Sequence, residues 1–380
     1  MTEKKILAIS FYGSTKHQLI PYKSIEFVDV VEFETNKNNA GVPGSIEDFE
    51  KLDIDYRKYY AVITWGDSLF PVIEYFFKKC LSHNITIYGN QHGVNKSILQ
   101  IIFSAPNKYC KYWLTEGAFM IDRFKEVTKS NAIENRWYCV GSPHHEFIYK
   151  NFKWSLNNTN SKVLIIHEPN LFIAENDKRC HNSEEIIDSM IEVLNDLNIE
   201  IDLKVHPNWK GDTGNSGKSL KKFNCNYVDI SFDEIVKYSL VVGSRSSLLY
   251  ESYLMNIPVL AIKSKSDWPD DKISFLDCGV VDSYELVDFK KAINMHFNKS
   301  KEINIEKVKY LSGDIDNNLN NYLTFIREDS QNKLGKLSMS TYKRFTRALK
   351  SSKEKNKYIE LIKHKLLLMY PRLYKIIISI

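Results

Sequence analysis

The sequence lacks the usual marks of a secreted or membrane-spanning protein. Residues 1–5 lead directly into a strand-like run, without the charged, apolar and small-residue zones of a signal peptide. No uninterrupted apolar segment approaches the ~20 residues that span a bilayer. The six cysteines are scattered, with no Cys-x-x-Cys pair and no metal-ligand spacing, so we expect reduced thiols. These absences predict a cytoplasmic address.

Charge of both signs is present but unevenly distributed. The chain carries a net charge of +5, yet residues 333–380 contain thirteen Lys and Arg against two Glu. This segment therefore has a balance of +11, and the preceding 332 residues sum to −6. An acidic body argues against nucleic-acid binding, and the basic end is a local feature.

The length and the apolar content indicate two folded domains. A chain of 380 residues exceeds one ordinary core and suits two domains of roughly 150 residues each plus an extension. Hydrophobic residues make up 43% of the chain, which is enough for buried cores. A polar stretch at 153–161, rich in Asn and Ser, marks a linker. We therefore predict domains at 1–152 and 162–325, followed by a basic tail at 333–380.

Apolar strands and helical segments alternate along both predicted domains. This rhythm is typical of a parallel sheet that helices cover on both faces. The predicted strands are 5–10, 60–64, 85–88, 111–114 and 137–140 in the first domain, and 162–166, 199–205, 227–230, 238–242 and 258–262 in the second, with a last candidate at Val280. The predicted fold class is α/β, with two facing Rossmann-like doubly wound domains and a basic helical extension.

Polar clusters follow many of these strands, and ligands of open α/β sheets bind beyond the carboxyl ends of the strands. The clusters are Gly13-Ser14-Thr15, Gly66-Asp67 and Asn90-Gln91-His92-Gly93 in the first domain, and His167-Glu168, His206-Pro207 and Gly243–Ser247 in the second. Glu116, in Leu114-Thr-Glu-Gly117, is a further candidate. If the two halves face one another, these clusters line one cleft.

The most informative cluster is the serine turn, Gly243-Ser-Arg-Ser-Ser247, which joins an apolar strand to a helix carrying Glu251. A helix N-terminus has unpaired amides and the positive end of a dipole, so it attracts anions. A phosphate held by Ser244, Ser246 and Ser247 would leave a sugar hydroxyl within reach of Glu251, one helical turn away. The turn therefore predicts nucleotide-sugar binding, with Arg245 as a further cation.

Five motifs, in this order, resemble the GT-B-fold glycosyltransferases of bacterial surface-polysaccharide synthesis. They are Gln91-His-Gly93, Gly141-Ser-Pro143, His206-Pro207, the serine turn with Glu251, and Asn256-Ile-Pro-Val259. Over about residues 5–325 the layout is similar to capsule polysaccharide transferases and to CDP-glycerol glycerophosphotransferase-like polymerases of teichoic acid.

Two departures refine this resemblance. Gly243-Ser-Arg-Ser stands where the polymerases typically have Asp-Tyr-Ser-Ser, which favours sugar transfer over polyol-phosphate transfer. The outline also resembles non-hydrolysing UDP-N-acetylglucosamine 2-epimerases, but no Arg-x-x-Thr-Glu-Arg-Pro-Glu stretch follows Pro258-Val-Leu260.

The resemblance implies roles for two histidines. His92 would be the acceptor-side base, and His206 would contact the donor together with Ser246 and Ser247. Histidine titrates near pH 6.5 and can therefore accept a proton at neutral pH. Prepositioned donors would stabilise the charge that develops on the leaving phosphate. Because no Asp-x-Asp cluster follows a predicted strand, we predict that the reaction needs neither a metal nor a cofactor.

Structural alternatives stand beside these functional roles. His92 would then cap a turn, His206 would make a structural hydrogen bond, and Ser246 and Ser247 would be ordinary N-caps, a position that serine favours. Glu251 would then pair with Arg245 instead of a ribose.

Three other polar residues have less definite places. Glu116 is as compatible with solvent exposure as with a cleft. We interpret the neighbouring His144 and His145 as surface residues and not as a metal pair, because adjacent side chains diverge.

The basic tail indicates membrane association. Residues 340–350 and 358–370 place apolar side chains on one helical side with Lys and Arg around them. Such segments lie in an anionic membrane interface, each nearby cation contributing about 1 kcal/mol. The alternatives are a helix that packs on the first domain and a disordered basic end.

The sequence therefore predicts a cytoplasmic glycosyltransferase, peripheral on the inner face of the cell membrane. Its substrates would be a nucleotide-sugar donor and a glycan or lipid-linked glycan acceptor of a bacterial surface polysaccharide. Two other functions stay open. One is a CDP-alditol polyol-phosphate transferase, and the other is a non-catalytic nucleotide- or glycan-binding module.

Overall fold

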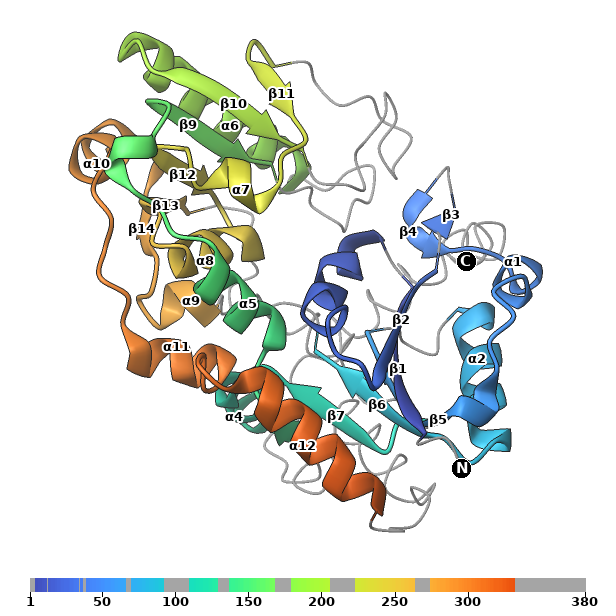
Figure 1. Ribbon diagram of the computed structural model, residues 1–380. Coiled ribbons are helices and arrows are strands. Elements are labelled where there is room, and N and C mark those ends of the chain that lie inside the picture. The colour runs from blue at the N-terminus through green and yellow to red at the C-terminus, as the bar shows by residue number, and fades with distance from the viewer. Residues whose placement is uncertain are drawn as a thin grey trace. The chain divides into compact units, whose positions relative to one another are not determined.

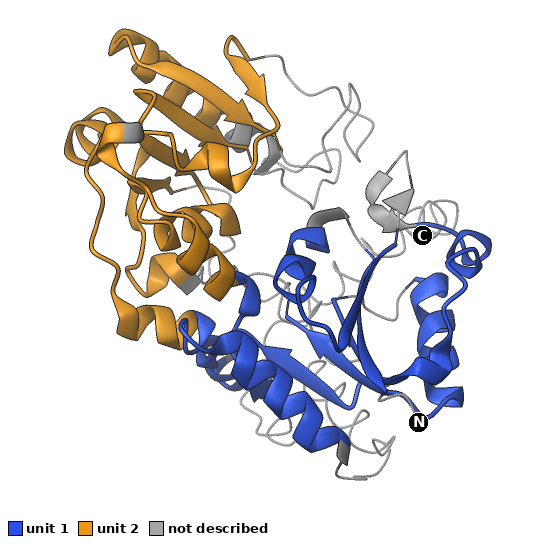
Figure 2. Cartoon of the chain, in the orientation of Figure 1, with its two compact units in different colours: residues 1–92, 96–144, 312–380 blue, residues 93–95, 145–311 orange. Residues whose placement is uncertain are grey.

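The chain folds into two compact units. The computed structural model describes residues 4–11, 13–33, 35–36, 39–65, 70–91, 109–128, 137–167, 179–205, 223–263 and 274–331 (Figure 1). Unit 1 comprises 1–92, 96–144 and 312–380, and unit 2 comprises 93–95 and 145–311 (Figure 2). The predicted tail at 333–380 lies outside the described residues.

Unit 1 is built on a six-stranded sheet in which every pairing is parallel. The strand order is β2-β1-β5-β6-β7-β8, so the chain reverses its direction across the sheet between β1 and β5. The strands are β1 (Lys5–Ser10), β2 (Val28–Glu32), β5 (Tyr59–Thr64), β6 (Thr86–Asn90), β7 (Tyr112–Thr115) and β8 (Trp137–Cys139).

Helical segments pack on the unit 1 sheet. The 3₁₀ segment η1 (Gly13–Tyr22) and helix α12 (Asn318–Gln331) join the apolar cluster that includes Ile6 and Ala8 of β1. Helix α2 (Pro71–Ser82) has proline at its first position, where the missing N–H costs nothing, and buries five side chains. The remaining elements are β3 (Thr35–Asn36), β4 (Asn39–Pro43), α1 (Ile46–Glu50), η2 (Tyr56–Lys58) and α4 (Ala118–Thr128).

Unit 2 contains a second parallel six-stranded sheet, with the order β11-β10-β9-β12-β13-β14. The strands are β9 (Lys162–Ile166), β10 (Glu200–Lys204), β11 (Asn226–Val228), β12 (Leu240–Gly243), β13 (Val259–Ile262) and β14 (Asp282–Tyr284). β10 and β11 follow β9 outward on one side of it, and β12, β13 and β14 lie in order on the other side. This is the order of a doubly wound dinucleotide-binding sheet.

Helices α6 and α10 cover one face of the unit 2 sheet, in a cluster with alternate side chains of β9, β10, β12 and β13. Helix α8 contacts β12 and β13. The helical elements are α5 (Pro143–Asn151), η3 (Leu156–Asn158), α6 (Arg179–Asp196), α7 (Phe232–Ile235), α8 (Ser247–Leu254), α9 (Ser274–Asp277), η5 (Leu286–Asp288), α10 (Phe289–His296) and α11 (Ile305–Ser312). The predicted α/β class with two Rossmann-like sheets is confirmed.

The unit boundaries differ from the predicted domain boundaries at α12. The sequence placed residues up to 325 in the second domain, whereas α12 buries Tyr322, Leu323 and Ile326 in the core of unit 1. A helical period in the sequence shows which side of a helix is apolar, but it does not show which sheet that side covers.

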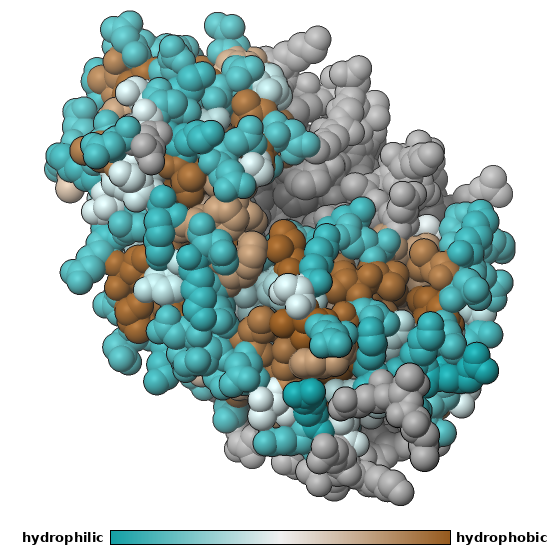
Figure 3. All heavy atoms as spheres, viewed as in Figure 1, coloured by the Kyte–Doolittle hydropathy of each residue, from teal (hydrophilic) through white to brown (hydrophobic). Residues whose placement is uncertain are grey.

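The described surface is largely hydrophilic on the face seen in Figure 3, where charged and polar side chains surround smaller apolar groups. Within the described residues, no helix combines the length and the hydropathy that crossing a membrane requires.

Candidate functional site

The reversal of strand order in unit 2 lies between β9 and β12, which pair directly. Loops leave two such neighbouring strands toward opposite sides, so a crevice opens at their carboxyl ends. The register aligns Val242 with Ile165. Both strands end one residue later, at Gly243 and Ile166, and they are followed directly by Ser244 and His167. The predicted turn therefore occupies the usual ligand position of a doubly wound sheet.

Gly243 packs against Ile166 of the neighbouring strand β9. A Cβ atom at position 243 would lie 3.4 Å from both the Cβ and the carbonyl oxygen of Ile166, which is ordinary van der Waals contact. The following residues, Ser244 to Ser247, are half-buried and therefore remain partly accessible to a ligand.

Ser246 is the N-cap of α8. Its backbone is extended, with φ of −60° and ψ of 136°, and its Oγ accepts a hydrogen bond from the Leu248 amide at 3.3 Å. The Leu249 amide donates to the Ser246 carbonyl at 3.0 Å. The turn thus satisfies two of the first-turn amides itself, as the structural alternative predicted for Ser246. An anion at this turn would be held mainly by the remaining amide, the hydroxyls and Arg245.

Glu251 and His167 are both buried near this turn. Glu251 lies one helical turn after Ser247 in α8 and is 5% exposed. His167 directly follows β9, is 3% exposed, and donates its backbone N–H to the Lys204 carbonyl at 3.0 Å. The sequence predicts the cluster His167-Glu168 after this strand, without giving His167 a role of its own. The signal for His167 is its position directly after the apolar run of β9.

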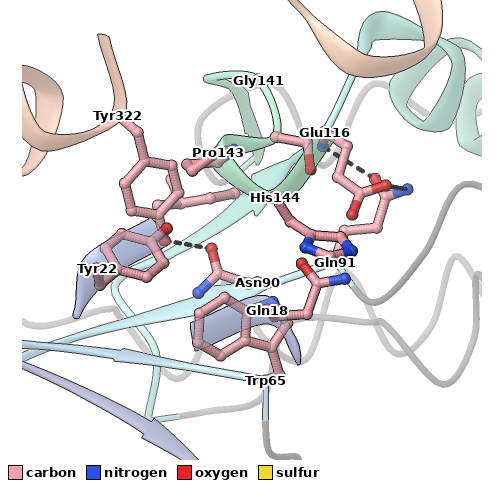
Figure 4. Close-up of a pocket in the computed structure, with 12 residues that line it drawn as sticks. Gln18, Tyr22, Trp65, Asn90, Gln91, Glu116, Gly141, Pro143, His144 and Tyr322 are labelled. Atoms are coloured by element: carbon pink, nitrogen blue, oxygen red, sulfur yellow. Dashed lines mark hydrogen bonds between the residues drawn. The ribbon is translucent and has the colours of Figure 1, made fainter. Parts of the chain in front are cut away.

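Unit 1 carries its own polar pocket at the carboxyl ends of β5 to β8 (Figure 4). Gln91 and Glu116, both predicted site residues, meet there across the β6–β7 edge. The Gln91 Nε2 donates to Glu116 Oε2 at 3.4 Å, and the Glu116 backbone N–H donates to Gln91 Oε1 at 3.2 Å. Both side chains are buried, at 2% and 5% exposure. The structure thus decides against solvent exposure of Glu116.

A buried hydrogen-bond network forms another wall of this pocket. The Tyr322 hydroxyl of α12 donates to Asn90 Oδ1, and Asn90 Nδ2 donates to the Thr64 carbonyl at 3.2 Å. Burial raises the pKa of Tyr322 and also that of the neighbouring Tyr22. Both phenols therefore stay neutral at physiological pH.

The surface assignment of His144 and His145 is wrong. Both are 0% exposed. His144 lines the unit 1 pocket, with its ring centroid 4.6 Å from that of His17. His145 belongs to unit 2 and packs edge-on against Tyr250 at 5.2 Å. Both lie in the first turn of α5, where helical backbone sends adjacent side chains in different directions.

Several predicted site residues stay untested. His92, His206, Asp67 and Glu168 lie outside the described residues. Ser14 lies in η1, but its side chain is outside the described part.

Comparison with known proteins supports the fold. No protein-family model and no curated protein sequence matches the chain. The UDP-GlcNAc 2-epimerase of Methanocaldococcus jannaschii, solved with UDP-GlcNAc and UDP, is similar with a TM-score of 0.53 and 14% identity, over 85% of this chain and 99% of that one. The wall teichoic acid polymerase TagF, solved with CDPG, gives 0.52 and 14%, over 87% and 90%.

The UDP-GlcNAc 2-epimerase of Neisseria meningitidis bound to UDP-GlcNAc gives a TM-score of 0.51 and 11% identity, over 85% of this chain and 100% of that one. Because these identities are low, the likeness establishes the fold alone. The chain has the GT-B layout of two Rossmann-like domains.

Proposed function

We propose that this protein is a glycosyltransferase that moves a sugar from a nucleotide-activated donor to a growing bacterial surface polysaccharide. The observation that carries the proposal is the serine turn at the switch point of the unit 2 sheet, where the neighbouring strand β9 ends just before the buried His167. The reversal of strand order and a helix N-terminus with hydroxyls beside it are features that nucleotide phosphates use in such sheets.

On the donor side, the serine turn would contact the phosphates through Ser244, Arg245, Ser246 and Ser247. His206 would stabilise the leaving group. The Glu251 carboxylate would accept a hydrogen bond from the ribose. On the acceptor side, His92 would remove the hydroxyl proton. Hydrogen-bond donors aimed at a developing phosphate charge account for a large share of such catalysis, so this set needs no metal.

A thermal-shift screen of nucleotides tests the donor assignment. A ligand that binds only the native state stabilises it and so raises the unfolding midpoint. At a ligand concentration of 100 times Kd the stabilisation is about 2.7 kcal/mol. We expect one nucleoside diphosphate or its sugar conjugate to give a shift, and Arg245→Ala to reduce it.

Ser231→Ala is the matched control. Ser231 caps α7 of the same unit, a helix that follows the edge strand β11 in the chain. Ser246→Ala and Ser231→Ala each lose an N-cap, worth about 1 kcal/mol. Only Ser246→Ala should also reduce the nucleotide shift. Equal nucleotide shifts in both variants would contradict the assignment of the turn.

Metal independence has its own test. Donor turnover should continue undiminished in excess chelator, because the proposed charge stabilisation comes from hydroxyls, amides, Arg245 and histidines. Abolished turnover that added divalent cation restores would refute it.

A second candidate is polyol-phosphate transfer from a CDP-alditol, which the similarity to TagF favours. Incubation with labelled donors separates the two, because one reaction releases the nucleotide of a nucleotide-sugar and the other releases CMP from a CDP-alditol. A third candidate is a non-catalytic binding module. His92→Ala and His206→Ala variants that keep full glycan output in cells would support it.

A further inference from the structure

Glu116 is a carboxylate in an unusual place. It follows β7 directly, is 5% exposed, and lies at the carboxyl edge of the unit 1 sheet, where ligands of such sheets bind. Burial of a carboxyl group is costly unless the group is used in hydrogen bonds. Gln91 Nε2 donates to one oxygen of this carboxyl group at 3.4 Å, and Gln91 Oε1 is itself held by the Glu116 backbone N–H at 3.2 Å. The carboxyl group is therefore positioned before any ligand arrives.

The pocket that Glu116 lines is small and its walls are held in place. The pocket is partly open, and its volume is about 10 Å³, which admits roughly one water molecule or one hydroxyl group. Tyr322 and Thr64 hold Asn90 on one side, and Gln91 holds Glu116 on the other, as the hydrogen bonds drawn in Figure 4 show in part. The described lining residues supply a carboxylate, amides, hydroxyls, a Trp65 ring and the His144 imidazole, but no Lys or Arg.

We infer that this pocket is an acceptor subsite that receives one hydroxyl group of an uncharged sugar, with the Glu116 carboxylate as its hydrogen-bond acceptor. The inference rests on the proposed function, and it adds the class of acceptor: a neutral glycan unit, as opposed to one that bears a carboxylate or a phosphate at this position.

Two physical effects make the carboxylate selective. A hydroxyl that donates to a buried carboxylate forms a charge-assisted hydrogen bond, which is stronger than one between neutral groups. An anionic substituent at the same position meets a like charge in a weakly screened environment, and such a juxtaposition rejects the wrong ligand. Glu116 thus binds the neutral sugar and excludes the anionic one.

Saturation-transfer NMR with the full-length protein and simple methyl glycosides tests the subsite without a donor. Methyl glucoside and methyl N-acetylglucosaminide are the neutral probes, and methyl glucuronide is the anionic probe. At least one neutral glycoside should bind, and the glucuronide should not. Glu116→Gln should weaken the neutral glycoside about tenfold, the factor for losing one hydrogen bond to a charged group, and should admit the glucuronide.

Three variants make the result specific. Glu116→Gln has the same shape and can still accept from Gln91, so its thermal midpoint should match that of the wild type. Gln91→Ala should weaken the neutral glycoside while the glucuronide stays excluded, because the charge remains but its position is lost. Glu47→Gln, the same chemical change at an exposed position of α1, should have no effect.

The outcomes are decisive in both directions. Binding of the glucuronide by the wild type as strongly as the neutral glycosides would overturn the inference, and so would unchanged binding in Glu116→Gln. Binding of no glycoside at the highest soluble concentration would also overturn it. The nucleotide screen is independent of these measurements, so failure of this subsite and failure of the proposed donor site are distinguishable.

Discussion

Gly141 and Gly313 lie together where the chain leaves unit 1 and returns to it. Both have left-handed backbone, with φ of +88° and +81°. A Cβ at Gly313 would lie 2.5 Å from the Gly141 Cα. Asn318 Nδ2 joins the two segments by donating to the carbonyls of Ser142 at 3.2 Å and Ser312 at 2.7 Å. Two glycines and one amide side chain thus close this junction.

Gly141→Ala should destabilise unit 1 by about 2–4 kcal/mol, because left-handed backbone and a steric clash act together. The new Cβ would lie 1.8 Å from Asn318 Oδ1. Gly279→Ala is the control: its φ is +62°, but the nearest atom is Lys307 Nζ at 3.2 Å, the far end of a flexible side chain. The control should cost only about 1 kcal/mol. Urea unfolding of both variants measures the difference, and equal losses would contradict it.

His296 should make the stability of unit 2 depend on pH. Burial lowers the pKa of His296 below 6.5, although Asp282 opposes the shift and Lys301 and Lys299 add to it. The unfolded chain therefore binds the proton more tightly than the folded chain. The stability that neutral His296 contributes is complete above about pH 6.5 and is lost as the pH falls toward the folded-state pKa. The Tyr284 hydroxyl lies at hydrogen-bond distance from the His296 ring, 2.7 Å from Nε2.

Urea midpoints between about pH 7.5 and about pH 5.5 measure this effect. In His296→Gln, the urea midpoint should fall less than in the wild type as the pH is lowered. Tyr284→Phe removes the hydrogen-bond partner but keeps the titrating ring, so it should retain the decline. A wild-type midpoint that rises toward acid would show that the assigned direction of the pKa shift is wrong.

At the scale of elements, α12 is fastened to the unit 1 sheet by a buried ion pair as well as by apolar packing. Lys111 Nζ lies 2.7 Å from Asp329 Oδ1, and the two side chains are 13% and 9% exposed. The Tyr88 hydroxyl of β6 donates to the same carboxylate. Burial raises the pKa of Tyr88, so its hydroxyl stays protonated as a donor.

Asp329→Asn should destabilise unit 1 by about 3–5 kcal/mol, because it leaves the Lys111 charge buried without its counter-charge. Asp48→Asn provides the comparison, since Asp48 pairs with Lys51 at 2.7 Å on the exposed surface. Solvent screens that pair, so no measurable change is expected. Hydrogen exchange of α12 amides should report the loss in Asp329→Asn, and unaltered protection would argue against the role of the ion pair.

At the scale of the whole molecule, we predict that the basic segment at 333–380 determines location and does not take part in catalysis. Its balance of +11 contrasts with −6 for the rest of the chain, so the segment should bind anionic lipid. A protein ending at residue 332 should leave the membrane fraction but keep turnover on a soluble acceptor. Sedimentation with anionic vesicles at physiological salt measures this. A truncated protein that still sediments would contradict the prediction.

Local patterns were sufficient for most of the two sheets. The predicted strands 5–10 and 162–166 coincide with β1 and β9, because each is an apolar run bounded by polar or turn residues. The sequence did not predict β2. This strand, Val28-Asp-Val-Val-Glu32, mixes charged with apolar residues and lies at an edge of the sheet. β6 extends to Asn90 beyond its predicted end because pairing with β7 overrides the weak strand preference of Gly89 and Asn90.

The sequence by itself determined the α/β class and the polar residues that follow the strands, because both depend on neighbours along the chain. Only the tertiary structure decided that Glu116 and His144 are buried, that Ser246 is an N-cap, and that α12 completes unit 1. Those facts depend on contacts between distant segments, such as Tyr322 with Asn90 across 232 residues. Burial is a property of the packed chain, and a periodic pattern specifies an apolar face without specifying its partner.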